Sequence, residues 1–119
     1  MSGPLAKLPN PHLASVDRRK VVDYLLDATH PDNGGKAEFF ASLGFSTETA
    51  WSLVAALRAV AARGNTVDHV ESVHGGKDVV DGLLLPQTGI GIGRRIRTIW
   101  IVEPGQDAPR LVTAYPNKG

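Results

Sequence analysis

The chain contains no cysteine, and this absence excludes disulfide bonds, catalysis by a thiol and zinc sites with cysteine ligands. It also has no apolar run near the ~20 residues that a membrane-spanning helix needs. No charged-then-apolar segment of the signal-peptide type begins the chain. These absences predict a soluble protein without a membrane partner, located in the cytoplasm of a producing cell or of a target cell.

A strong excess of charge of one sign is missing too. The formal net charge is +1 over 119 residues, so the chain as a whole should not attract polyanions. Any binding of nucleic acid must therefore depend on local clusters of basic side chains. The length and the 42% hydrophobic content are typical of one soluble domain, and we expect residues 1–119 to fold as a single unit.

Helical signals occupy the first half of the chain. The prolines and missing periodicity of residues 1–14 predict an extended arm. Within a helical part at 15–64, apolar residues recur at helical spacing and predict helices over 18–26, 36–43 and 47–62. Asp17 is expected to cap the first helix, and Gly44 and Gly64 to end the other two.

Strand signals follow. Residues 65–116 contain short β-prone runs at 66–74, 77–84, 94–102 and 110–115, separated by glycine-rich turns. Gly75 and Gly76 are expected to form the tight turn of a hairpin. Helices first and strands second is the α+β pattern, which predicts three N-terminal helices packed on one face of a four-stranded antiparallel β-meander.

The run from Arg94 to Val102 carries the main functional signal. Successive side chains of a strand point to opposite faces, so Ile96 and Trp100 should face a core while Arg95 and Arg97 share the other face. Two guanidinium groups on an uncovered face could bind phosphate oxygens.

Several stretches together resemble a known family. They read KVVDYLL (20–26), HP (30–31), GKAEFF (35–40), LGF (43–45), GKDVVDG (76–82), RTIW (97–100) and PRLVTAYP (109–116). This set resembles a family of small bacterial domains of unknown function, which occur alone or at the C-terminal ends of larger, often toxin-like proteins. The resemblance covers nearly the whole chain, implies a cognate immunity or antitoxin protein as a partner, and supplies no activity residue by residue.

The expected fold is also similar to the barnase/EndoU/colicin/RelE-like group of metal-independent ribonuclease toxins, which implies RNA as the substrate. Cleaving RNA without a metal requires a base, an acid and cations that stabilise the phosphorane. We therefore predict a metal-independent endoribonuclease of the toxin type that needs no cofactor and no metal. The predicted catalytic residues are His74, Lys77, Arg97 and Thr113, and the predicted substrate-binding residues are Arg95, Arg110 and Tyr115.

Other interpretations remain open. His74 and Lys77 could be solvated residues beside a turn, Arg95 and Arg97 the wet face of a strand, and Thr113 and Tyr115 ordinary strand formers. The predicted sheet offers one well-placed histidine and no second one for an acid–base pair. The alternative function is a non-enzymatic partner-binding module, either antitoxin-like or an accessory domain of a phage or secretion system. A third possibility is a nucleotide site, because His30 and the Gly34-Gly35-Lys36 turn precede a helix whose free N–H groups could bind an anion.

Overall fold

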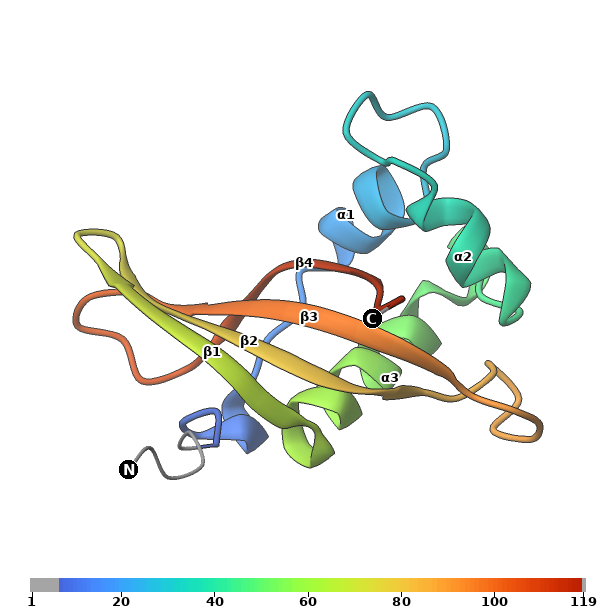
Figure 1. Ribbon diagram of the computed structural model, residues 1–119. Coiled ribbons are helices and arrows are strands. Elements are labelled where there is room, and N and C mark those ends of the chain that lie inside the picture. Colours follow the sequence, from blue (N-terminus) through green and yellow to red (C-terminus); the bar gives the residue numbers. More distant parts are fainter. Residues whose placement is uncertain (1–6, 119) are drawn as a thin grey trace.

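The computed structural model describes residues 7–118 and has an α+β fold built on one antiparallel sheet (Figure 1). Its helices are α1 (Arg18–Lys20), α2 (Lys36–Ser42) and α3 (Ala50–Arg63), with the single turns η1 (Pro11–Leu13), η2 (Val21–Leu25) and η3 (Thr47–Thr49). Its strands are β1 (Asn65–Ser72), β2 (Gly75–Leu84), β3 (Arg94–Val102) and β4 (Arg110–Pro116). Within the described range, no helix is long and apolar enough to span a bilayer.

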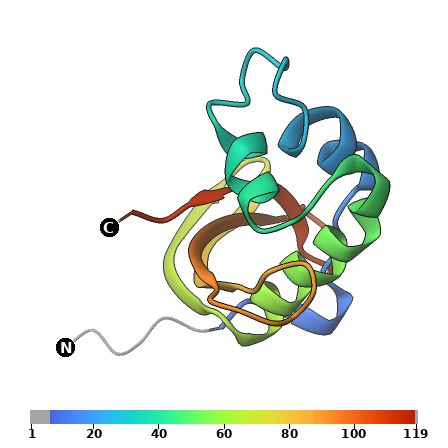
Figure 2. The ribbon, with the colours of Figure 1, turned by 90° about the vertical axis from the view of Figure 1, so that its right-hand side faces the viewer.

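The strands follow one another across the sheet in the order β1-β2-β3-β4, all antiparallel, so the predicted meander is confirmed. Viewed end-on, the strands form a curved layer and α3 lies against one side of it (Figure 2). The prediction that all three helices pack together on one face of the sheet is not confirmed. Helix α3 packs on β2 and β3, whereas α2 contacts β4 and α1 lies beside that strand (Figure 1).

The predicted alternation of buried and exposed side chains along β3 is confirmed for the residues that face the core. Ile96, Thr98 and Trp100 are fully buried on the face toward α3. The Trp100 indole donates to the Thr98 hydroxyl at 2.7 Å, and that hydroxyl donates to the carbonyl of Val80 at 2.8 Å. The polar atoms in this part of the core are therefore satisfied, as burial requires.

The helix ends agree with most of the local signals. Asp17 caps α1 by accepting from the Arg19 N–H at 2.9 Å, and Gly44 ends α2 with a left-handed φ of 90°. Gly64 ends α3 for another reason. Its backbone is extended, but a Cβ there would lie 2.6 Å from the carbonyl oxygen of Asp81, so only glycine allows the helix end to approach β2 this closely.

The first hairpin turn is made by Val73 and His74 and not by the two glycines. Ser72 pairs with Gly75, and the Ser72 hydroxyl both donates to the Gly75 carbonyl at 3.1 Å and accepts from the His74 N–H at 3.1 Å. Gly75 is instead needed inside β2, because a Cβ would lie 2.2 Å from the carbonyl oxygen of Val102 on the neighbouring strand. The turn prediction was wrong because the close approach of two neighbouring strand backbones also requires glycine.

The predicted arm lies only in part within the described residues. From residue 7 onward the segment is packed on the domain: Leu8 and Ala14 are buried, and Ser15 forms a bridge to Arg110 at the start of β4. Residues 1–6 lie outside the described part. The expectation of an extended arm is therefore wrong for 7–14, which contains the turn η1 and contributes to the core.

Candidate functional site

The face of the sheet turned away from α3, called the outer face here, carries most of the predicted site residues. Residues paired across neighbouring strands share a face. Three rows cross it: Lys77, Ile101 and Arg110; Val79, Ile99 and Thr113; Asp81, Arg97 and Tyr115. Arg95 is paired with Leu83 in the next position. These pairings place Lys77, Arg95, Arg97, Arg110, Thr113 and Tyr115 on one face, whereas His74 lies in the turn.

Arg97 is held by a carboxylate. Its Nε donates to Asp81 Oδ1 at 2.7 Å and its Nη2 to Asp81 Oδ2 at 2.8 Å, which is a bidentate pair. The Asn117 amide donates to the same carboxylate at 3.1 Å. The hydrogen bond and the charge of Asp81 raise the pKa of Arg97 further above its ordinary value. The guanidinium charge is thus already paired, and a phosphate would compete with Asp81 for it.

The other predicted substrate-binding cations differ from each other. Arg110 donates to Glu103 at 2.9 Å in an exposed ion pair. Arg95 has no ion pair with any residue that the structure describes, and it lines a groove discussed below. Tyr115 lies opposite Arg97.

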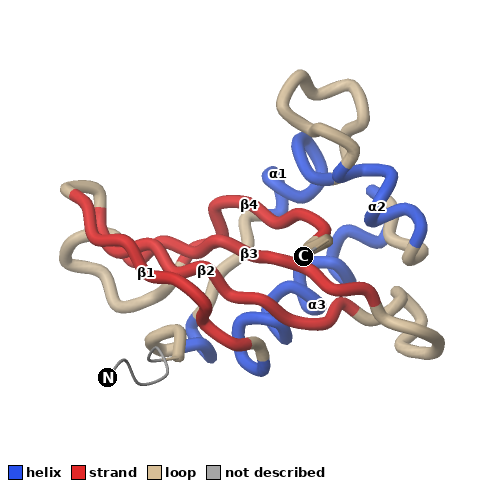
Figure 3. The backbone as a smooth tube through the Cα atoms, in the orientation of Figure 1, coloured by secondary structure: helices blue, strands red, loops and turns tan. Residues whose placement is uncertain are grey.

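His74 is not part of this arrangement. It lies exposed in the turn at one end of the sheet, while the loop between β2 and β3 lies at the other end (Figure 3). Gly75, which follows it, is six residues before Asp81 along β2, a separation of ~20 Å at strand spacing. Lys77 pairs with Val70 and does not face His74 across the hairpin. The structure therefore does not bring His74, Lys77, Arg97 and Thr113 into one site.

Thr113 contributes to a different pocket, at the outer edge of β4. Its hydroxyl lies 3.2 Å from the Tyr24 hydroxyl, and the Lys20 ammonium donates to the Val112 carbonyl at 2.9 Å. Lys20 and Tyr24 are four residues apart and so lie on one side of the helical turn. We call this the β4-edge pocket; its lining comprises Asp17, Arg19, Lys20, Asp23, Tyr24, His30, Asp32, Val112 and Thr113.

His30 enters the β4-edge pocket from the loop before α2. Its ring packs edge-on against Tyr24, with centroids 5.0 Å apart. The N–H of Asp32 donates to Nδ1 at 3.1 Å, so the neutral ring carries its proton on Nε2. Two ammonium groups also lie near the Tyr24 ring, that of Lys20 at 5.9 Å and that of Lys36 at 5.5 Å from the centroid, which is cation–π distance.

Asn33 holds this loop in place. Its side chain is 3% exposed and donates to the carbonyls of Tyr24 at 2.6 Å and Leu25 at 3.2 Å. Its Oδ1 accepts from the Ala37 N–H at 2.9 Å, at the start of α2. One amide thus joins the end of η2 to α2 and fixes the loop that carries His30. No local pattern in the sequence marks Asn33, because its partners come from two elements.

The β4-edge pocket contains the chemical groups that metal-free acid–base chemistry needs. The Lys20 and Lys36 ammonium groups bond to neutral carbonyls and form no ion pair with a described residue. Three carboxylates line the pocket as well; Asp17 caps α1, whereas Asp23 forms no hydrogen bond with its side chain among the described residues. The His30 imidazole, the Asp23 carboxylate, the Lys20 ammonium group and the hydroxyls of Tyr24 and Thr113 therefore line one open pocket, whereas Lys36 lies near the Tyr24 ring and is not part of the lining.

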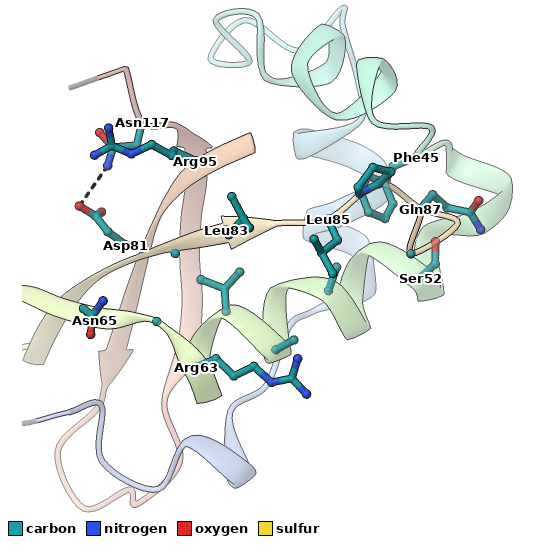
Figure 4. Close-up of a pocket in the computed structure, with 17 residues that line it drawn as sticks. Phe45, Ser52, Arg63, Asn65, Asp81, Leu83, Leu85, Gln87, Arg95 and Asn117 are labelled. Atoms are coloured by element: carbon teal, nitrogen blue, oxygen red, sulfur yellow. Dashed lines mark hydrogen bonds between the residues drawn. The ribbon is translucent and has the colours of Figure 1, made fainter. Parts of the chain in front are cut away.

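A second and larger hollow, the β2 groove, lies between α3 and the end of β2 (Figure 4). It has a volume of about 660 Å³ and an apolar floor that includes Val60, Leu83 and Leu85. Arg63 lies on its helix side, and Arg95, Asp81 and Asn117 gather at its other end (Figure 4). Sequence reasoning missed this groove, since it forms only where α3 folds back beside β2.

A polar cluster lies on the inner face, near the hairpin. His69 Nδ1 lies 2.6 Å from Asp78 Oδ1, and Nε2 lies 2.7 Å from Glu71 Oε1. Asp78 is 4% exposed, and the hydrogen bonds to Asp78 and then Glu71 raise the pKa of His69 above 6.5. Both ring nitrogens are occupied, so this histidine stabilises the hairpin. No group of His, Asp and Glu within residues 7–118 has the arrangement of a metal site.

Comparison with known proteins gives a family and a fold. The family model described as "Domain of unknown function (DUF6883)" matches residues 7–118, so the predicted membership in a family of unknown function is confirmed. Among curated proteins there is no significant match. A solved chain from the "Contact-dependent growth inhibition toxin - immunity protein complex from Klebsiella pneumoniae 342" is similar in structure, with a TM-score of 0.69 at 15% identity. The match covers 92% of this chain and 97% of that one, and it shows a shared fold.

Proposed function

We propose that this chain, which belongs to the DUF6883 family, is a metal-independent RNA-cleaving domain of the toxin type whose site is the β4-edge pocket. The observation that carries the proposal is the meeting of His30, Tyr24, Lys20 and Thr113 in that pocket. The likeness to a chain of a toxin–immunity complex supports a place in such a system. The domain would act in the cytoplasm of the producing or the target cell.

In the proposed reaction the ribose 2′-oxygen attacks the adjacent phosphorus. The Asp23 carboxylate takes the 2′-hydroxyl proton, and the bond from phosphorus to the 5′-oxygen breaks. A protonated His30 ring gives its Nε2 proton to that leaving oxygen; protonation at Nδ1 displaces the Asp32 N–H contact. The products are a 2′,3′-cyclic phosphate and a free 5′-hydroxyl.

The remaining groups stabilise charge. Lys20 and Arg19, which line the pocket, would stabilise the negative charge that the equatorial phosphate oxygens gain, and the hydroxyls of Tyr24 and Thr113 would donate hydrogen bonds to those oxygens. Thr113 also belongs to a row of the outer face, where it pairs with Ile99, and Tyr115 follows two residues later on the same face of β4. The predicted roles of Thr113 and Tyr115 are thus retained in this proposal, whereas His30 replaces His74.

The test is cleavage of total RNA by purified protein in the presence of EDTA. We expect His30→Ala and Asp23→Asn each to lower the rate at least ~100-fold, the usual contribution of a positioned acid or base. His74→Ala is the matched control and should leave the rate unchanged, because it lies outside the pocket. Intact RNA with the parent protein, or a His30→Ala variant with parental folding and parental cleavage, would contradict the proposal.

A further inference from the structure

The end of β2 has a free edge. Pairing with β1 stops at Asn65 opposite Asp81, because the chain turns at Gly64 into α3. Strand β2 continues through Gly82, Leu83 and Leu84, which pair only with β3 in the described part of the chain. An edge of this kind presents backbone N–H and C=O groups that another strand can bind.

The side chains around this edge are suited to a peptide. Leu83 is 57% exposed and Leu85 is 45% exposed, and both line the β2 groove together with Val60 and Pro86 (Figure 4). Ile90 and Ile92, in the loop that follows, are almost fully exposed. Two leucines at alternate positions beside an open edge form the usual binding surface for an added strand.

The charged side chains at the β2 groove favour an occupant of negative charge. Arg63 and Arg95 have no ion pair with a described residue, whereas the Asp81 carboxylate is already bound by Arg97 and Asn117. The groove is therefore positive at both sides. A second copy of this chain would bring the same two arginines against each other. The lining of the groove offers single-stranded RNA no exposed ring to stack on, because its aromatic residue, Phe45, is buried.

We propose that the free edge of β2 receives an extended acidic segment of a partner protein, which adds a short strand to the sheet. The partner's alternate apolar side chains pack on Leu83 and Leu85, and its carboxylates pair with Arg63 and Arg95. This binding is separate from RNA cleavage, since the groove and the β4-edge pocket have no lining residue in common. A toxin-type domain could thus be held by a partner without obstruction of its catalytic pocket.

The probe is a fluorescein-labelled peptide of alternating valine and glutamate, titrated with the full chain by fluorescence anisotropy. We expect binding, with slowed amide exchange at Leu83 and Leu85 measured by NMR. Reversing both charges, Arg63→Glu with Arg95→Glu, should weaken binding at least ~10-fold. A Lys7→Glu with Arg18→Glu variant carries the same change in net charge outside the groove and should bind like the parent.

Four results would overturn the proposal. They are no binding up to ~1 mM, equal binding by the charge-reversed variant, self-association through the same edge, and preferential binding of oligouridine. The His30→Ala variant separates the two proposals, because it should bind the peptide like the parent whether or not the parent cleaves RNA.

Discussion

The outer face of the sheet and the β4-edge pocket both contain cations, but the fold treats those cations differently. On the outer face Arg97 faces the Asp81 carboxylate in a bidentate pair. In the pocket the Lys20 ammonium group faces the Val112 carbonyl and the Tyr24 ring, and outside the lining the Lys36 ammonium group faces the Asn33 carbonyl and the same ring. A basic residue binds a phosphate more readily when no carboxylate pairs with it. Arg97 is paired with Asp81, whereas Lys20 forms no ion pair with a described residue, although three carboxylates line the same pocket.

The two histidines with ring hydrogen bonds show the same contrast. His69 lies between two carboxylates and has both nitrogens occupied. His30 lines the β4-edge pocket and accepts one backbone N–H at Nδ1, and its Nε2 has no hydrogen bond with a described residue. The residue type alone therefore does not identify an acid or base, because the bonding of both nitrogens decides the role.

The largest loss of stability is expected when the loop that carries His30 is released from its anchor at Asn33. Asn33→Ala removes three hydrogen bonds and leaves buried backbone groups of η2 and α2 without partners. We expect the free energy of unfolding to fall by about 2–4 kcal/mol, measured by urea denaturation, and RNA cleavage to fall with the loss of the His30 loop geometry. Asn65→Ala, at an exposed position, is the control and should change stability by less than ~0.5 kcal/mol. A parental stability for Asn33→Ala would show that the amide does not hold the loop.

A smaller effect is expected on the outer face. Asp81→Asn removes the charge that binds Arg97, and because this pair is partly exposed the loss of stability should be at most ~1 kcal/mol. The difference from the parent should shrink as salt rises, since screening weakens the pair. Glu103→Gln breaks the more exposed Arg110 pair and provides the matched comparison. A loss above ~3 kcal/mol for Asp81→Asn would mean that Arg97 behaves as a buried charge.

The smallest effect concerns the inner-face histidine and its pH dependence. Because Asp78 and Glu71 raise the folded pKa of His69 above its unfolded value, the protonated ring stabilises the folded state. This contribution is fully present below the unfolded pKa of 6.5 and is lost as the pH rises through the folded pKa. Denaturation of the parent and of His69→Gln should therefore differ most at about pH 5 and converge at about pH 9. A difference that grows with pH would show the opposite sign of linkage.

Local rules predicted much of the fold. The bounds of β3 at Arg94–Val102 and the burial of Ile96, Thr98 and Trp100 follow from strand alternation. The cap at Asp17 and the terminator at Gly44 follow from backbone preferences of single residues. The hairpin turn could not be predicted in the same way, because Gly75 is required by its close contact with Val102, which lies far along the chain.

Patterns in the sequence predicted the family, the α+β class, the order of the strands and which residues of β3 face the core. Which polar residues meet depended on how distant segments pack. This packing joined His30, Tyr24 and Thr113 across almost ninety residues, and it gave Arg97 to Asp81. The physical reason is that a side chain's charge and hydrogen-bonding capacity are local, whereas its partner is set by the packing of distant segments.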